Sequence, residues 1–189
     1  LQEKGVIITS AISILEGTPD PSPEEIEEII LAARKAGDSV GGAISCTVTG
    51  ISAGFGAPDF GCNAEGIFAQ HLFAVPAVKG IAFGAGFGFS CMRGSEANDP
   101  FYMEEGQVKT RTNASGGING GITNGMPIVF EVAIRPTPSI AMEQNTVDLA
   151  EKKDATLVIE GRHDPCIVQR ALPVVEAAAA LASCELLGL

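Results

Sequence analysis

Residues 42–51 have the sequence Gly-Ala-Ile-Ser-Cys-Thr-Val-Thr-Gly-Ile, in which apolar and polar side chains alternate and β-branched residues are frequent. This alternation predicts a β-strand with one buried face. Residues 78–83 and 128–134 have the same character, and residues 5–15 predict a strand or an extended segment. We therefore expect a sheet at the centre of the fold.

Residues 22–37 predict an amphipathic helix with a solvated charged face. Ser22 and Glu25 form a capping box around Pro23, and Gly37 ends the helix. We treat the 18–37 segment as a peripheral helix on a single domain that covers residues 1–189.

Residues 63–75 predict a second helix, capped by Asn63. A third is expected from about 165 to 187, where Pro173 should kink it or split it. The elements together predict the α+β class, with an antiparallel or mixed sheet covered by helices on one face.

The segments between these elements are less regular. Residues 94–115 lack periodicity and predict a long loop of the kind that is often functional. Residues 135–155 predict a loop or a short helix, and residues 157–160 a short strand.

Composition excludes several classes of function. Asp and Glu number 23 against 12 Lys and Arg, for a net charge of −11, which argues against a general nucleic-acid or anionic-membrane binder. No apolar run approaches the ~20 residues of a membrane helix. The five cysteines and two histidines, without a CxxC motif, argue against a metal site and fit a reducing cytosol.

Two glycine clusters invite a ligand interpretation. Gly84–Gly88 fails the dinucleotide motif because Phe89 stands where a glycine is needed, so a structural turn is favoured. Residues 116–125 read Gly-Gly-Ile-Asn-Gly-Gly-Ile-Thr-Asn-Gly, and this density suits either close approach to an anion or flavin or a pair of tight turns. Spacing does not separate these two alternatives.

Two further stretches carry charged and hydroxyl side chains. Arg135-Pro-Thr-Pro-Ser139 predicts either a rigid phosphate grip or a proline-stiffened loop. In Gly161-Arg-His-Asp-Pro165, Arg162 is a candidate anion clamp and His163 and Asp164 are candidate proton carriers, although Asp164 also suits a helix cap.

Taken in order, these segments resemble the C-terminal half of the chorismate synthase family. The resemblance runs from about residue 37 to residue 183. The segments that carry it are GDSVGG (37–42), PAVKGIAFGAGF (76–87), RGSEAND (93–99), TNASGGINGGITNG (112–125), VAIRPTPSI (132–140), and GRHDPC followed by RALPVVEA (161–177).

The resemblance implies a fold and a reaction. The family fold is a β-α-β sandwich, of which this chain is expected to be about one half. The implied activity is that of a lyase of the shikimate pathway, which forms chorismate by 1,4-anti elimination of phosphate from 5-enolpyruvylshikimate 3-phosphate. That reaction needs reduced FMN, with NADPH a possible flavin reductant.

The resemblance also implies site residues. Asp164 matches the aspartate that handles a proton at the flavin, and it is the expected catalytic residue. The expected flavin contacts are Pro76, Ala77, Gly120, Arg135, Pro136, Thr137, Pro138, Ser139 and Arg162. Pro76 replaces a common Asn, so only backbone contacts are expected there, and Arg135 replaces the usual lysine.

The same resemblance implies what this chain lacks. The family's N-terminal half supplies two catalytic histidines and several substrate-binding arginines, and none of those motifs occurs here. The chain opens Leu-Gln-Glu-Lys without an initiator Met, so we expect a piece of a longer cytoplasmic protein. The family is tetrameric and a homodimer of this piece is plausible; the rival interpretation is a non-catalytic FMN-binding or assembly module.

Overall fold

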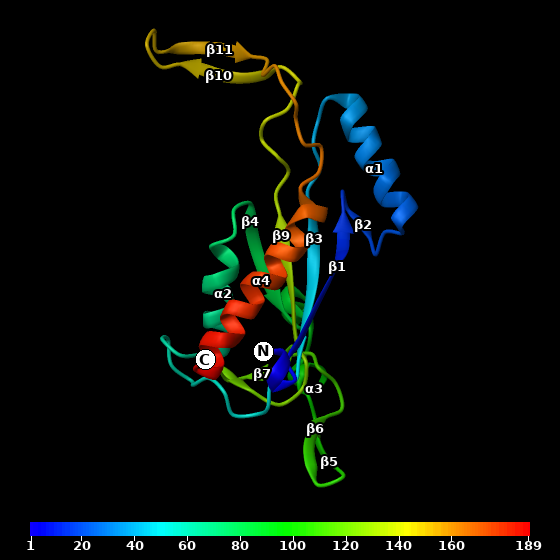
Figure 1. Cartoon of the computed structure of the whole chain (residues 1–189), viewed down its shortest axis with the longest axis vertical. Coiled ribbons are helices and arrows are strands. Elements are labelled where there is room, and N and C mark those ends of the chain that lie inside the picture. Colours follow the sequence, from blue (N-terminus) through cyan, green and yellow to red (C-terminus); the bar gives the residue numbers. More distant parts are fainter.

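The computed structural model describes all residues, 1–189, and has a five-stranded sheet at its centre (Figure 1). The strand order is β2-β1-β3-β9-β4, and every neighbouring pair is antiparallel. The strands are β1 (Ile7–Leu15), β2 (Thr18–Pro19), β3 (Gly42–Thr49), β4 (Val78–Phe83) and β9 (Ile128–Ile134). The strands expected from alternation are therefore confirmed.

Two helices, α2 (Ala64–Phe73) and α4 (Val168–Leu187), lie side by side and cover one face of the sheet (Figure 1). Between these layers Phe68 packs against Phe130, with ring centroids 5.7 Å apart, and against Phe83 at 6.5 Å. The α+β class with helices on one face is confirmed. None of the helices combines the length and the apolar character needed to cross a bilayer.

Helix α1 (Pro23–Ala36) lies apart from α2 and α4, beside the β2 edge of the sheet (Figure 1). Its N-terminus has the expected capping box between Ser22 and Glu25, and Gly37 ends it in the left-handed conformation at φ 70°. Ala33 is its only buried residue, and the partly buried Ile26, Ile29 and Ile30 of the same helix pack against the core.

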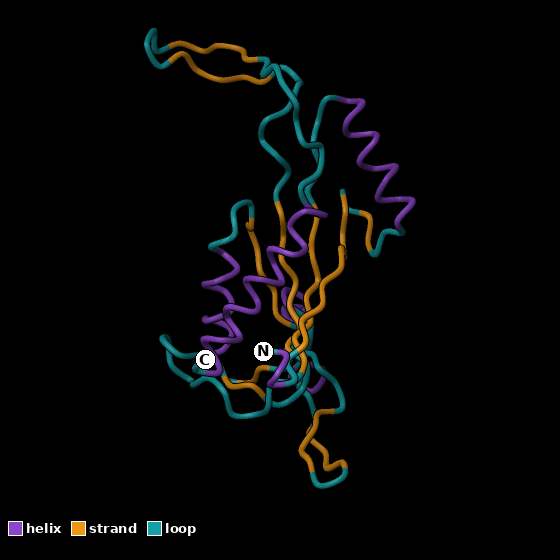
Figure 2. Tube along the Cα trace, viewed as in Figure 1, coloured by secondary structure: helices purple, strands orange, loops and turns teal.

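Two hairpins project from opposite ends of the molecule, and the predictions for both regions were wrong (Figure 2). Residues 94–115 form a short helix, α3 (Gly94–Ala97), and the hairpin β5 (Phe101–Glu104) with β6 (Gln107–Thr110). Residues 135–155 contain β10 (Gln144–Asp148), which pairs with β11 (Lys153–Leu157), so a strand at 157–160 was also wrong. Strands that extend into solvent have no core face, and the alternation that reveals buried strands is therefore missing.

Helix α4 departs from expectation at its start, and Pro173 does not split it. It begins at Val168 rather than near residue 165, because Pro165 and Cys166 instead pair with Val40 at the start of β3. The helix continues unbroken through Pro173, near its N-terminal end, where only one intrahelical hydrogen bond is lost.

The remaining short elements lie at the end of the sheet that is opposite the β10–β11 hairpin. They are the 3₁₀ turns η1 (Gln2–Lys4) and η2 (Gly86–Cys91) and the tight hairpin β7 (Ile118–Asn119) with β8 (Ile122–Thr123). The Gly-rich stretch thus contains a pair of short paired strands.

Candidate functional site

Three segments that are distant in sequence meet where β9 ends and the β10–β11 hairpin departs (Figures 1 and 2). They are residues 37–40, 135–141 and 159–166, and we call this region the junction. Three hydrogen bonds tie the first segment to the other two: Ala141 N–H to Gly37 O at 2.9 Å, Ser39 Oγ–H to Thr137 O at 2.6 Å, and Val40 N–H to Pro165 O at 2.8 Å. The junction thus fixes the Arg-Pro-Thr-Pro-Ser and Gly-Arg-His-Asp-Pro stretches relative to each other.

His163 connects the second and third segments of the junction. Its Nε2 lies 2.8 Å from the Ile159 carbonyl oxygen, and its Nδ1 lies 3.0 Å from Ser139 Oγ. A carbonyl oxygen only accepts, so Nε2 carries a hydrogen, and in the neutral ring Nδ1 accepts from the Ser139 hydroxyl. The resemblance assigned no role to His163, and here it positions Ser139.

Asp164 uses both carboxylate oxygens. Oδ2 accepts from Arg170 Nη1 at 2.7 Å, and Oδ1 accepts from the Cys166 N–H at 3.2 Å. The alternative of Asp164 as the cap of α4 is wrong, because Ile167 occupies that position. Burial raises the pKa of the neighbouring Cys166 thiol, so Cys166 stays protonated.

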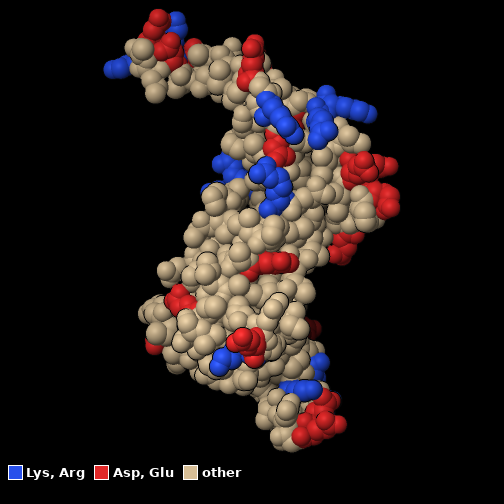
Figure 3. All heavy atoms as spheres, in the orientation of Figure 1, with Lys and Arg blue, Asp and Glu red and all other residues tan.

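A cleft of about 860 Å³ opens between the junction, the C-terminal end of α1 and the first turn of α4. The charged or titratable groups that line it are Arg34, Asp38, Arg162, His163, Asp164 and Arg170. Asp164 pairs with Arg170, whereas Arg34 and Arg162 form no ion pair. Lys and Arg gather on this part of the surface, whereas acidic side chains gather toward the start of α1 and the tip of the lower hairpin (Figure 3).

This cationic cleft suits an anion despite the negative net charge of the chain. Sequence reasoning found Arg162 but missed Arg34 and Arg170. Arg34 lies in the last turn of α1, where a basic residue is also favoured by its interaction with the helix dipole. Only the fold shows that it lies over the same cleft as Arg162.

The Pro76-Ala77 turn joins the junction from the other side. Ala77 O accepts from the Arg135 N–H at 3.0 Å, and Ala77 adopts φ 72°, a left-handed conformation that is unusual for a residue other than glycine. Backbone strain of this kind costs about 1–3 kcal/mol and concentrates at functional sites. The contact to Arg135 is a backbone contact, as Pro76 requires.

The Arg135–Ser139 loop has free capacity for a ligand. The Arg135 side chain is exposed and its only hydrogen bond is a long one, 3.4 Å, to the Pro136 carbonyl. Thr137 Oγ1 is buried and lacks a hydrogen-bond partner. An unsatisfied hydroxyl and an exposed guanidinium on the same short loop fit the phosphate of a flavin nucleotide.

Gly120 lies apart from the other predicted contacts. It occupies the turn of the β7–β8 hairpin, near the start of β9, whereas the junction lies at the end of β9, about 20 Å away along the strand. A Cβ on Gly120 would meet nothing within 4 Å, so there is open space at this position. The structure therefore brings together Pro76, Ala77, Arg135–Ser139, Arg162 and Asp164, and leaves Gly120 at the opposite end of the sheet.

Asp99 anchors the Gly-rich end and was not singled out from the sequence. It is buried and accepts from the Thr112 hydroxyl at 2.6 Å and from the N–H groups of Ala114 and Ser115 at 2.7 and 2.8 Å. Burial alone would raise the pKa of Asp99, but the bonds from Thr112, Ser115 and Ala114 outweigh burial and hold the pKa below its usual range. Asp99 is therefore a structural carboxylate.

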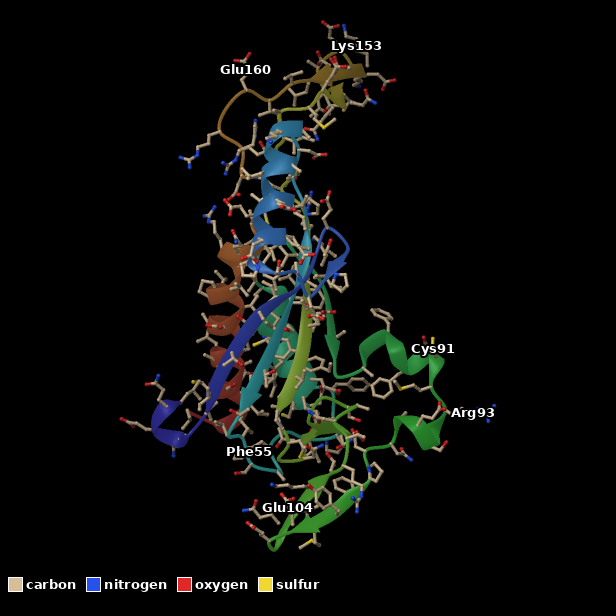
Figure 4. All side chains as sticks on the ribbon, turned by 90° about the vertical axis from the view of Figure 1, so that its right-hand side faces the viewer. Phe55, Cys91, Arg93, Glu104, Lys153 and Glu160 are labelled. Atoms are coloured by element: carbon tan, nitrogen blue, oxygen red, sulfur yellow. The ribbon has the colours of Figure 1, made fainter.

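Arg93 precedes Asp99 in the same stretch but has a different environment. Its side chain extends away from the body of the protein, on the same projecting region as Cys91 (Figure 4). The side chain forms no ion pair within the chain. Nothing in its surroundings connects Arg93 to the junction.

Comparisons with known proteins agree with this architecture. The family model described as chorismate synthase matches residues 10–187. A chorismate synthase of Thermococcus kodakarensis is 48% identical over 165 residues, which are 87% of this chain and 45% of that protein. One from Thermococcus gammatolerans is 53% identical over 154 residues, 82% of this chain and 42% of that protein.

A crystal structure of chorismate synthase has the same fold. It superposes with a TM-score of 0.79 at 24% identity, and the match covers 98% of this chain and 58% of that one. The chain spans about half the length of the curated relatives it matches. By its sequence and its fold, the chain belongs to the chorismate synthase family.

Proposed function

We propose that the chain forms the flavin-binding half of a chorismate synthase, a lyase that forms chorismate from 5-enolpyruvylshikimate 3-phosphate in aromatic amino acid biosynthesis in the cytoplasm. The observation that carries the proposal is the junction, which joins the Pro76-Ala77 turn, the Arg135–Ser139 loop and the Arg162–Asp164 stretch beside a cationic cleft. These are the stretches that the family resemblance assigns to reduced FMN.

Each of these residues has a proposed task. Arg135 and the unsatisfied Thr137 hydroxyl hold the flavin phosphate, and the Ala77 backbone positions the ring system. Bound reduced FMN supplies the electron density that loss of the substrate phosphate requires. Arg162 stabilises negative charge in the cleft. The Arg170 side chain and the Cys166 N–H position the Asp164 carboxylate, which accepts the proton that is handled at the flavin.

The remaining cofactor contacts are proposed on the resemblance. Pro136 and Pro138 stiffen the loop, Ser139 closes it, and Gly120 offers open space to a ligand. NADPH is the proposed reductant of the flavin in the complete protein. Nucleic acids and membranes are not proposed partners, because the net charge of −11 disfavours both.

The chain alone is not expected to complete the reaction. Its histidines are both engaged, His163 with Ser139 and Ile159, and His71 with Glu185 at 2.7 Å between α2 and α4. His71 lies at the α2–α4 contact and is not among the residues that line the cleft, and His163 is placed as a positioning residue for Ser139. This observation favours the second candidate, a non-catalytic FMN-binding or assembly module, if no other chain segment completes the site.

Self-association is the proposed partner interaction. Phe73 on α2 and Val174 and Leu181 on α4 are apolar and exposed. Val174 and Leu181 are two helical turns apart, so they lie on the same side of α4. Pairing of two copies, or contact with a second family half, would cover these side chains.

A chimera tests the proposed activity. The corresponding half of the Thermococcus kodakarensis relative is replaced by this chain, and chorismate formation is measured with reduced FMN. We expect turnover, and Asp164→Ala should lower it about 10²–10⁴-fold. Arg111→Ala is the control, because Arg111 only stacks on Tyr102, 5.0 Å from the ring centre, in the β5–β6 region. A chimera that folds and binds FMN but forms no chorismate would favour the module.

A further inference from the structure

Residues 37–41 belong to a stretch that carries the family resemblance, yet the proposed reaction gives them no part. They precede β3, and they lie beside the loop that follows β9. The two strands pair antiparallel, and the last pair in this direction is Gly42 with Ile134. The same register places Ser39 opposite Thr137. Ser39 therefore lies where the ladder between the two strands would continue.

The backbone ladder does not continue at this position. Pro136 and Pro138 have no N–H group to donate. The Ser39 N–H forms no bond to the loop either, because it donates to the Asp38 carboxylate at 2.7 Å. Instead, the Ser39 hydroxyl donates to Thr137 O at 2.6 Å. A side chain thus holds the loop where the backbone does not.

The Ser39 bond is the short one in this part of the loop. The carbonyl oxygens of the two prolines accept only contacts of 3.4 Å, from the Arg135 and Gln144 side chains. The Thr137 hydroxyl is buried and lacks a partner. Ser39 is therefore the main polar contact that fixes Thr137.

Two glycines let the segment lie close to the loop. A Cβ on Gly41 would lie 2.7 Å from Ile134 O and 2.8 Å from Pro136 Cδ, closer than Cβ contacts in real structures. At the other end of the segment, the Gly37 carbonyl oxygen accepts from the Ala141 N–H at 2.9 Å. The segment thus supports the loop from its first residues to its last.

We propose that Ser39 is a positioning residue for the flavin phosphate, because it fixes Thr137 before the flavin binds. The inference rests on the proposed function, in which Arg135 and the Thr137 hydroxyl hold that phosphate. A loop fixed in its bound conformation loses less entropy on binding than a mobile one. Removal of the Ser39 hydroxyl should therefore weaken the phosphate contact. The ring contact at Ala77 should remain, because Ala77 bonds to Arg135 and not to Ser39.

The contrast between FMN and riboflavin tests this inference, because riboflavin has the same ring system without the phosphate. The 189-residue chain is titrated into dilute flavin, and the flavin fluorescence is followed. Ser39→Ala should weaken FMN binding about fivefold, the usual effect of one neutral hydrogen bond, and riboflavin binding by less than about twofold. Ser39→Thr keeps a hydroxyl and should restore the FMN affinity. If Ser39→Ala fails to fold, Ser39→Cys replaces it, because a thiol is a weaker donor.

A second substitution shows whether Ser39 acts through Thr137. Thr137→Val removes the hydroxyl and should weaken the binding of FMN but not that of riboflavin. The double variant should bind FMN no more weakly than Thr137→Val alone, because residues that act through one another are not additive. Ser45→Ala is the control and should change neither affinity, since the Ser45 hydroxyl makes only a 3.4 Å contact within the sheet.

The outcomes separate this inference from the proposed function. Equal losses of FMN and riboflavin affinity in Ser39→Ala, or no loss of either, would overturn the inference even if the chimera forms chorismate. A parent chain that binds FMN no more tightly than riboflavin would also overturn it. A loss confined to FMN, restored by Ser39→Thr, would support the inference even if the chimera is inactive.

Discussion

The two ends of β9 are built in different ways. At the Ile134 end, the chain segments are joined by side chains of Ser39, Ser139 and His163, a cationic cleft opens beside them, and the Thr137 hydroxyl is unsatisfied. At the Ile128 end, glycines pack backbone against backbone, and Asp99 satisfies three donors. The Ile134 end therefore has polar groups that are free to bind a ligand, whereas most polar groups named at the Ile128 end are satisfied within the chain.

The comparison changes the interpretation of the glycine cluster. A Cβ on Gly117 would lie 2.4 Å from Pro127 O, and one on Gly116 would lie 2.6 Å from Val129 O. Gly121 is equally restricted, with Ala57 O at 2.6 Å. Only Gly120 faces open space, so close packing explains most of the glycines that sequence reasoning could equally assign to a ligand.

The largest expected effect is that of Gly117→Ala. The added methyl group would collide with backbone, and φ 83° is strained for alanine, so we expect a loss of about 3 kcal/mol or more in the free energy of unfolding. Gly120→Ala is the matched control, with a cost of about 1 kcal/mol from its positive φ alone. Urea denaturation measures both, and equal losses would contradict the packing account.

Asp99→Asn should cost about 2–3 kcal/mol at pH 7, because the amide NH₂ would face donors that the carboxylate now satisfies. The pKa of Asp99 is lowered by folding, so its stabilisation is complete above the ordinary aspartate pKa of about 3.9 and is lost as pH falls through the folded pKa. The difference in unfolding free energy between parent and variant should be constant from pH 5 to 8 and shrink below about pH 4. A difference that grows on acidification would refute this role.

Ser39→Ala should cost about 1 kcal/mol, because it removes the bond to Thr137 O. It should also accelerate hydrogen exchange of the Ala141 amide, which bonds to Gly37 in the same junction. Ser45→Ala is the control, since the Ser45 hydroxyl makes only a 3.4 Å contact to Ala11 O. Slower or unchanged exchange at Ala141 would show that the junction segments are not coupled.

The smallest effect is expected for His71→Gln. The His71–Glu185 pair is partly exposed, with 25% and 50% of the two side chains accessible, so its contribution should stay within about 0.5 kcal/mol. Thermal denaturation checks this value. A loss above 1 kcal/mol would mean that the α2–α4 contact depends on this pair.

The sequence was sufficient to predict the strands that have a buried face and the helix that begins with a capping box. Alternation in 42–49 and 128–134 and the capping box at Ser22 each express a local rule, and the structure confirms them. The projecting hairpins were missed because strands without a buried face lack that pattern. The resemblance predicted most of the junction residues. It did not predict Arg34 and Arg170, because the cleft brings together segments that are more than a hundred residues apart in the sequence. It also did not predict the His163–Ser139 bond, which joins the two sides of a hairpin.

We propose the junction, and not the Gly-rich end, as the principal flavin contact of this chain. Amide chemical-shift mapping with FMN measures this directly, and it detects the weak binding expected of an incomplete site. We predict that the largest shifts fall on Ala77, Thr137, Ser139, Arg162 and Asp164, with small shifts at most across 116–119. Shifts confined to 116–125, or none at millimolar FMN, would contradict the account.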